Sequence, residues 1–195
     1  MTTKSYSVTR TGLVYYTGGH TGMTYAQVRN QSSSNGSIGA SQALETHYGS
    51  YEIGREVLIV DTSSDPLPVG AVITAAYFTF TRAYSTVAVP ADDPYYDIVS
   101  VAGLGIHNPA IASDFGLLIN ANTVHCTKRM LDITYLSTLV MILPAAGIAE
   151  LNINGVTLFG ARNSGELNNV EPTGQSSVTY DAFMEIGRAS CRERV

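Results

Sequence analysis

Two apolar runs on either side of a proline-containing turn, within residues 55–80, constrain this chain more than any other feature. The first run, Val57–Val60, is continuous, which is typical of a strand covered on both faces. Residues 65–70 then interrupt any regular element, because Pro66 and Pro68 fix φ and lack a backbone donor. The second run, residues 71–84, is rich in β-branched and aromatic side chains and alternates toward its end. We expect two strands that pair with each other across the turn as a hairpin.

Local chemistry supports a turn at this place. The side chains of Asp61 and Ser63 can hydrogen-bond nearby backbone amides, and Pro68 and Gly70 suit the turn dihedrals. Arg55 precedes the first run and is either a ligand anchor or the partner of Asp61 or another carboxylate. We favour the carboxylate pairing.

The rest of the chain alternates short candidate strands with turns. The predicted strands cover residues 5–11, 24–31, 95–103, 133–143, 155–162 and 176–183. A short helix is predicted within 144–154, where Pro144 precedes good helix formers, and residues 108–122 can hold a helical turn. This pattern predicts an all-β fold, an antiparallel β-sandwich of jelly-roll-like form with one or two short helices.

The chain fits a single domain, which we place at residues 1–185. Residues 186–195, IGRASCRERV, resemble the translation of a sequencing adapter and are interpreted as a non-native tail, with the alternative of a genuine basic tail. On the first interpretation Cys126 is the one native cysteine, which excludes a disulfide framework and a cysteine metal cage.

Charge and hydropathy limit the partners. With a net charge of −5 and a charged content of 14%, the chain lacks the excess of positive charge that attracts nucleic acid or an anionic membrane. No apolar stretch approaches the roughly 20 residues of a membrane helix. The first residues lack the apolar centre of a secretory signal, so we expect synthesis in the cytoplasm and, after release, a place in a virion or extracellular particle.

The stretch around the turn also carries a family resemblance. Arg55, the Asp-Thr-Ser of 61–63, Pro68, Gly70 and the Ile-Thr-Ala-Ala of 73–76 together resemble the central hairpin of DNRLRE-type β-sandwich domains. These domains are similar to some carbohydrate-binding modules and occur in secreted polysaccharide-binding proteins and in phage-like structural proteins. The likeness covers roughly residues 48–180. It implies a β-sandwich and, without a secretory signal, favours the virion type.

Two groups of side chains near residues 84–97 are candidate binding residues. Asp92, Asp93 and Asp97 can bind Ca²⁺ through carboxylate oxygens, or form a solvated turn, or supply a glycosidase-like pair. The other group consists of aromatic residues that can stack on sugars, fill an interface or pack in the core: Tyr84, Tyr95 and Tyr96.

Catalytic constellations are not evident in the sequence. His125 and Cys126 are adjacent, but neighbouring strand residues point to opposite faces, so we favour a buried structural Cys126 over a nucleophile. We therefore expect no enzymatic activity and no cofactor other than an optional Ca²⁺.

The resulting hypothesis is a non-enzymatic structural or decoration protein of a phage-like particle. It would bind other virion or assembly proteins, form a homo-oligomer, and bind neither nucleic acid nor membrane. The alternative is a carbohydrate-binding module that recognises polysaccharide through exposed tyrosines. A third hypothesis, a hydrolase domain, requires two of the carboxylates at Asp92, Asp93 and Asp97 to face a cleft.

Overall fold

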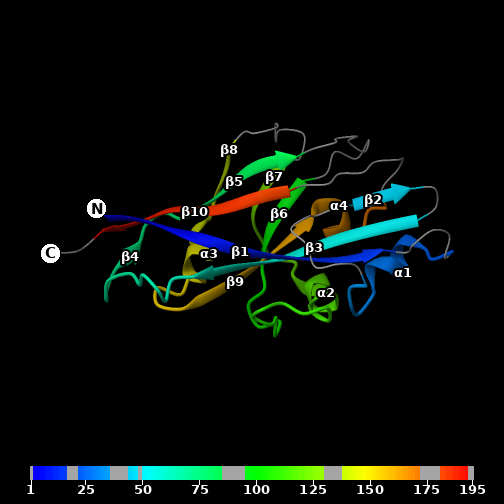
Figure 1. Ribbon diagram of the computed structural model, residues 1–195, viewed down its shortest axis with the longest axis horizontal. Helices are drawn as coiled ribbons and strands as arrows, with labels where there is room; N and C mark the ends of the chain where they lie inside the picture. Colours follow the sequence, from blue (N-terminus) through cyan, green and yellow to red (C-terminus); the bar gives the residue numbers. More distant parts are fainter. Residues whose placement is uncertain are drawn as a thin grey trace.

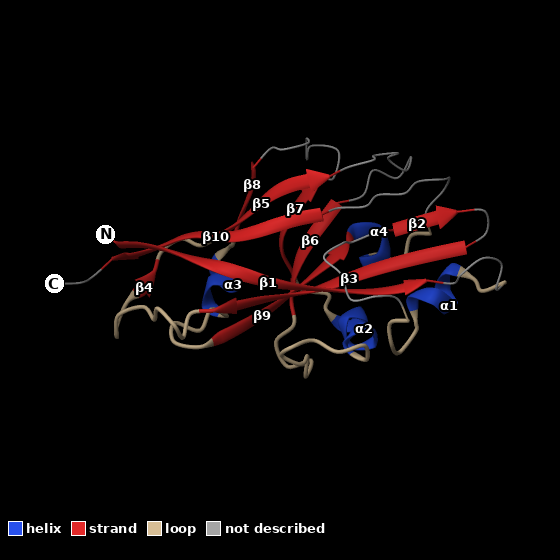
Figure 2. Ribbon diagram, in the orientation of Figure 1, coloured by secondary structure: helices blue, strands red, loops and turns tan. Residues whose placement is uncertain are grey.

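A computed structural model describes residues 2–16, 22–35, 44–47, 50–84, 95–129, 138–171 and 181–192. Strands dominate, and short helices lie beside them (Figures 1 and 2). The strands are β1 (Thr2–Tyr16), β2 (Leu44–His47), β3 (Ser50–Asp61), β4 (Val72–Ile73), β5 (Tyr77–Tyr84), β6 (Tyr95–Ser100), β7 (Val124–Arg129), β8 (Thr138–Ile142), β9 (Val156–Asn163) and β10 (Asp181–Arg192). The helices are α1 (Tyr25–Arg29), α2 (Asp114–Leu117), the 3-10 turn η1 (Leu118–Asn120), α3 (Ala145–Ala149) and α4 (Ser164–Leu167). The predicted all-β, antiparallel fold class is confirmed.

Strand β1 connects two groups of strands. The strand order is β7-β6-β9-β3-β1-β10-β5-β8, with β2 beside β3 and β4 beside β10. Residues Thr2–Ser7 of β1 pair with β10, whereas Val8–Tyr16 pair with β3. The long β1 ribbon in Figure 1 therefore belongs to one group in its first half and to the other in its second half.

Side chains from both groups share one hydrophobic cluster. Leu58 and Phe159 come from β3 and β9, while Phe78 and Met141 come from β5 and β8. The rings of Phe78 and Phe159 meet edge to face with centroids 5.4 Å apart, a favourable aromatic geometry. The two groups of strands thus pack against each other through this cluster.

A second cluster covers the opposite face of β3, β6 and β9. Val57 and Ile59 of β3 contact the helical segments there, including Phe115 of α2 and Leu118 of η1. All four residues of Val57–Val60 are buried, alternating between the two clusters. The prediction of a strand covered on both faces is confirmed.

The predicted hairpin between the two apolar runs is wrong. In the described residues β3 and β5 do not pair, because β1 and β9 already occupy both edges of β3 over residues 56–60. Strand β5 pairs instead with β10 and β8. The segment from residue 62 to 76 crosses from one group of strands to the other, so the two runs meet through side chains rather than through backbone hydrogen bonds.

The turn chemistry within that crossing is as predicted. Asp61 Oδ1 accepts the backbone N–H of Ser63 at 2.8 Å. Gly70 has φ +82°, a left-handed conformation that favours glycine, and Ala71 N donates to Pro68 O at 2.9 Å. Leu67 N donates to Ile153 O at 3.0 Å, which ties the crossing to the loop before β9.

The strand predicted over residues 24–31 is also wrong, because this segment is helix α1. Thr24 and Gln27 form a capping box, in which each side chain accepts from the other residue's backbone N–H. Tyr25 and Val28, three residues apart, are both buried on the inner side of the helix. The capping signal and this spacing outweigh the β-branched and aromatic content.

The strands predicted over 5–11, 95–103 and 155–162 are present with adjusted ends as β1, β6 and β9. For the predictions over 133–143 and 176–183, the described parts belong to β8 and β10, and residues 133–137 and 176–180 lie outside the described residues. Helix α3 follows Pro144, and α2 with η1 forms the helical turn within residues 108–122. Strand β10 runs past residue 185, and its backbone pairs with β1 as far as Thr2 and Cys191. In the described ranges, no helix is both long and apolar enough to cross a bilayer.

Replacing Phe78 tests the packing of the two groups of strands. Phe78→Ala should lower the free energy of unfolding by about 3–5 kcal/mol, because the side chain is fully buried between them. A double-mutant cycle with Phe159→Ala should yield a coupling of about 0.5–1.5 kcal/mol from the edge-to-face contact. Denaturant unfolding measures both; additive losses would contradict the contact, and Val69→Ala, at a fully exposed position, is the control.

Candidate functional site

Strand β6 places the predicted binding residues on different sides of the protein. Tyr95 is 40% exposed, whereas Tyr96 and Asp97 are buried. Tyr84 ends β5, but its side chain, like Asp92 and Asp93, lies outside the described residues. The structure therefore brings Tyr95 to the surface and Tyr96 into the interior, and these two rings do not share one exposed face.

Tyr96 belongs to a buried polar group with Glu56 and Arg10. Its hydroxyl donates to Glu56 Oε2 at 2.9 Å, and Arg10 donates to Glu56 Oε1. Burial raises the pKa of Glu56, although the neighbouring Arg10 charge opposes the rise. Burial and the Glu56 charge also hold the pKa of Tyr96 well above its usual range. The Tyr96 hydroxyl is thus committed to an internal partner.

Asp97 points to the opposite side of β6 from Tyr96. Burial raises the pKa of Asp97, while a hydrogen bond with Thr127 and the charge of Arg162 lower it. Over the ranges that the structure describes, no three His, Cys, Asp or Glu side chains gather closely enough to hold a metal ion. Asp97 is thus buried on the other face of β6 from Tyr96, near Thr127 and Arg162.

The most highly charged buried group centres on Glu166. Its Oε1 accepts from Arg55 Nη2 at 2.7 Å and its Oε2 from Arg162 Nε at 2.6 Å. Arg29 adds a third guanidinium, which donates from Nε to the Glu166 backbone oxygen at 2.8 Å. All three of Arg55, Arg162 and Glu166 are fully buried.

This group ties several elements together. Arg55 Nη2 also donates to the Arg29 carbonyl at 2.7 Å, and its guanidinium lies 4.1 Å from the centre of the Phe115 ring. Arg162 Nη1 donates to the carbonyl oxygens of Ile119 and Ala121, both at 3.1 Å. The favoured interpretation of Arg55 as the partner of a carboxylate is confirmed, and that carboxylate is Glu166.

Local folding explains how Glu166 reaches the two arginines. Strand β9 ends at Asn163, whose side chain caps α4 by accepting from Gly165 N at 2.8 Å. The chain turns there, so Glu166 lies four residues after Arg162 and beside it. The sequence does contain opposite charges four residues apart, at Arg162 and Glu166. This spacing indicates an ion pair only if the chain forms a helical turn after β9.

Cys126 has the properties of a structural thiol. Burial, with a smaller contribution from the charge of Asp97, raises its pKa to about 12. The thiol is therefore protonated at neutral pH and is a weak nucleophile. The adjacent His125 makes a separate contact, between its Nε2 and Glu150 Oε1 at 3.0 Å.

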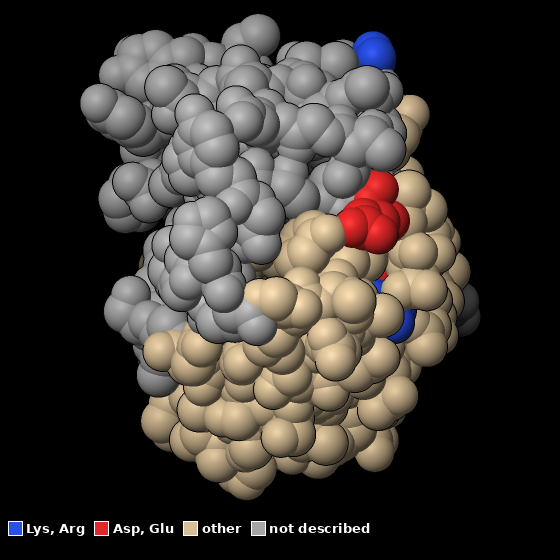
Figure 3. Space-filling model, turned by 90° about the vertical axis from the view of Figure 1, so that its right-hand side faces the viewer, with Lys and Arg blue, Asp and Glu red and all other residues tan. Residues whose placement is uncertain are grey.

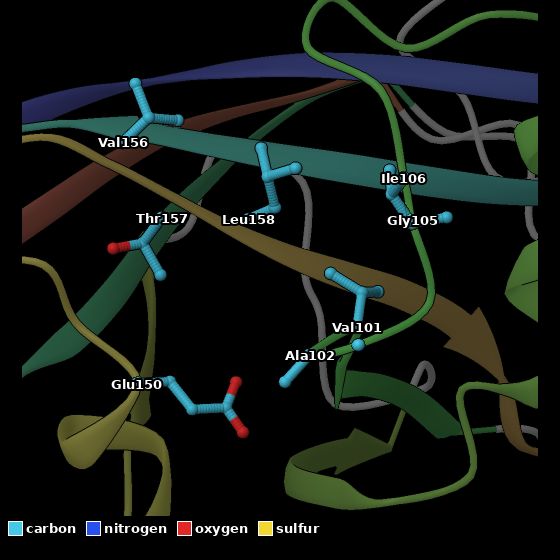
Figure 4. A pocket seen from close by; sticks show the side chains of 9 residues that line it. Val101, Ala102, Gly105, Ile106, Glu150, Val156, Thr157 and Leu158 are labelled. Atoms are coloured by element: carbon cyan, nitrogen blue, oxygen red, sulfur yellow. The ribbon is translucent and has the colours of Figure 1, made fainter.

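A groove lies between the loop that follows β6 and the start of β9 (Figure 4). It has a volume of about 360 Å³ and is open to solvent. Its lining residues are Val101, Ala102, Gly103, Gly105, Ile106, Glu150, Val156, Thr157 and Leu158. The Glu150 side chain extends from the loop after α3 toward Ala102, so a carboxylate stands beside a lining that is apolar except for Thr157 and the backbone. None of these residues was a sequence candidate, because the groove joins segments about 50 residues apart.

Exposed apolar side chains are a further surface feature. On the face shown in Figure 3, charged side chains are isolated among uncharged described atoms. On β8, the last strand in the order of the described strands, Val140 and Ile142 are 50% and 70% exposed, and Met141 between them is buried. Val140 and Ile142 therefore point outward from the same side of the strand, and we refer to this pair as the β8 face.

Searches for related proteins do not add a family. No protein-family model, no curated protein and no solved structure matches this chain.

The Glu166 group should make stability depend on pH. Burial raises the pKa of Glu166, but the charges and hydrogen bonds of Arg55 and Arg162 outweigh it, so the net pKa is lowered. A lowered pKa in the folded state stabilises the protein above the unfolded value of about 4.3, and this contribution is lost as pH falls below it. Glu166→Gln removes that titration and leaves the buried guanidinium charges without their counter-ion, which should cost about 3–5 kcal/mol at pH 7.

Denaturant unfolding between pH 3 and 7 provides the measurement. The natural sequence should lose more stability on acidification than Glu166→Gln. Asp65→Asn, which removes an exposed partner of Lys4, is the matched control and should cost about 1 kcal/mol or less. Equal pH profiles for the natural sequence and Glu166→Gln would contradict the role of this carboxylate.

Proposed function

We propose that the protein is a non-enzymatic structural or decoration component of a phage-like particle and acts through protein–protein contacts as a homo-oligomer. The observation that carries this proposal is the β8 face. Its outward apolar side chains lie on the last strand in the order of the described strands, where a neighbouring chain can reach them.

The fold proposed for this role is a two-layer, jelly-roll-like sandwich of the DNRLRE type. The strands joined to the second half of β1 form one layer, and those joined to its first half form the other. The shared cluster around Leu58, Phe78 and Phe159 supports this arrangement, since side chains from both layers fill it. Such sandwiches present edges and loops while their inner faces are occupied.

Several buried ionisable groups support a structural role. Glu56, Asp97 and Glu166 are buried and engaged with protein partners, and the Cys126 thiol is protonated. General acid–base or nucleophilic chemistry needs such groups to reach a substrate.

The β8 face predicts how self-association changes on mutation. Placing a charge there, with Val140→Lys and Ile142→Lys together, should weaken self-association by about tenfold or more, because a buried apolar side chain contributes about 1.5–3 kcal/mol. Val69→Lys, at a fully exposed position on the 62–76 segment, is the matched control. Sedimentation velocity over a concentration series measures the effect; a monomer for the natural sequence at all concentrations would contradict the proposal.

Carbohydrate binding remains the second candidate, and the exposed ring of Tyr95 supports it. An exposed aromatic ring can stack on a sugar face. If this function is correct, Tyr95→Ala should abolish binding on a glycan array with little change in stability. Tyr96→Phe, which removes only an internal hydroxyl contact, should keep binding. An array without any bound glycan for the natural sequence would reject this candidate.

A further inference from the structure

The groove beside β9 is large enough to admit a long side chain. Its volume of about 360 Å³ is near the lower end of the roughly 300–1,000 Å³ found for small-molecule sites. Gly103 and Gly105 have φ of +77° and +71°, and an added Cβ at either would meet nothing within 4 Å. These glycines form a smooth, open wall opposite Val156 and Leu158.

One charge distinguishes the chemistry of the groove. Of the described residues that line it, Glu150 alone is charged, and no aromatic ring is among them. A phosphate or another anion would find no cation there, and a sugar would find no stacking platform. Hydrocarbon that ends in a positive charge matches both the apolar walls and the carboxylate.

The Glu150 carboxylate is held in place from behind. His125 is packed against Gly147 of α3, where an added Cβ would lie 3.2 Å from His125 Cγ. The Phe159 ring meets the imidazole nearly edge to face, with centroids 5.9 Å apart. This fixed imidazole contacts Glu150 Oε1 at 3.0 Å, so the carboxylate loses little freedom when a ligand binds.

The same contact favours one type of cation. Among the described residues, His125 contacts Oε1 of the Glu150 carboxylate, so Oε2 is the oxygen that a ligand can bind. A guanidinium gains most from two parallel bonds to both carboxylate oxygens, whereas an ammonium is a compact point charge that needs one.

We propose that this groove binds the lysine side chain of a neighbouring protein chain. The lysine methylene groups would lie along Val101, Val156 and Leu158, and the ammonium would donate to Glu150. The proposal rests on the proposed function for the source of the lysine, a protein partner in an assembly. The groove itself is separate from the β8 face.

The test uses amino acids blocked at both ends as probes of the full chain. Nα-acetyl-lysine amide should shift backbone amide resonances of residues 101–106 and 156–158 in ¹⁵N-resolved NMR spectra, with a dissociation constant on the order of 1 mM. Nα-acetyl-norleucine amide carries nearly the same hydrocarbon without the charge and should bind about tenfold more weakly. Nα-acetyl-arginine amide should also bind more weakly than the lysine probe.

Two variants locate the interaction. Glu150→Gln keeps an oxygen that can face His125 but removes the charge, and it should weaken the lysine probe about tenfold. Glu171→Gln, a carboxylate outside the groove, should leave binding unchanged. Ala102→Phe fills the groove from an exposed position and should abolish binding if Glu150→Gln proves unstable. Equal binding of the lysine and norleucine probes, tighter binding of arginine, or unchanged binding by Ala102→Phe would overturn the proposal.

The outcome is separable from that of the β8 face. Probe binding in the groove can succeed while sedimentation shows a monomer, which would reject the homo-oligomer and retain the lysine site. Conversely, self-association that depends on Val140 and Ile142, without any shift near Glu150, would reject the lysine site alone.

Discussion

The contact between α1, α2 and η1 and the strands β3 and β9 depends on the ion pairs of the buried Glu166 carboxylate. This carboxylate receives hydrogen bonds from Arg55 and Arg162, while Arg29 binds the backbone oxygen of Glu166. Three guanidinium groups cannot be removed from water together without a counter-charge, because the desolvation of each costs several kcal/mol. Glu166 supplies that charge, and other donors of Arg55 and Arg162 hold carbonyl oxygens of α1, α2 and η1 against β3 and β9.

The adjacent pair Arg55 and Glu56 shows how this network fits into the sheet. Successive strand residues face opposite sides, so Arg55 enters the group around Glu166 and Glu56 enters the group with Arg10 and Tyr96. Both residues are completely buried. Strand β3 therefore carries a buried ion pair on each of its faces, and this explains why it is covered on both sides without being wholly apolar.

The proposed function depends on the side chains that remain exposed at the surface. With Tyr96, Asp97 and the acidic interior groups engaged, the described surface offers the apolar β8 face, the ring of Tyr95 and the groove with Glu150. All three can contact another molecule. On the proposed function, contacts with neighbouring chains would use the first and the last.

The failures of sequence interpretation have specific physical causes. Residues 24–31 have β-like composition, yet the reciprocal bonds of Thr24 and Gln27 start a helix whose buried residues are Tyr25 and Val28. The two apolar runs around Pro68 predict a hairpin, because a short turn usually joins paired strands. Nothing local reveals that β1 and β9, which are distant in sequence, occupy both edges of β3.

The sequence by itself determined the local features of this protein. Val57–Val60 is a doubly covered strand, Asp61 and Gly70 shape the turn, Pro144 precedes a helix, and the fold is all-β, because these depend on side chains and dihedrals within a few residues. Only the tertiary structure decided which strands pair, that both faces of β6 are covered at Tyr96 and Asp97, and which partners Glu166 and Glu150 find. The physical reason is that strand pairing and ion pairing join residues more than a hundred positions apart, such as Thr2 with Cys191 and Arg55 with Glu166, and their selection depends on packing that no local pattern contains.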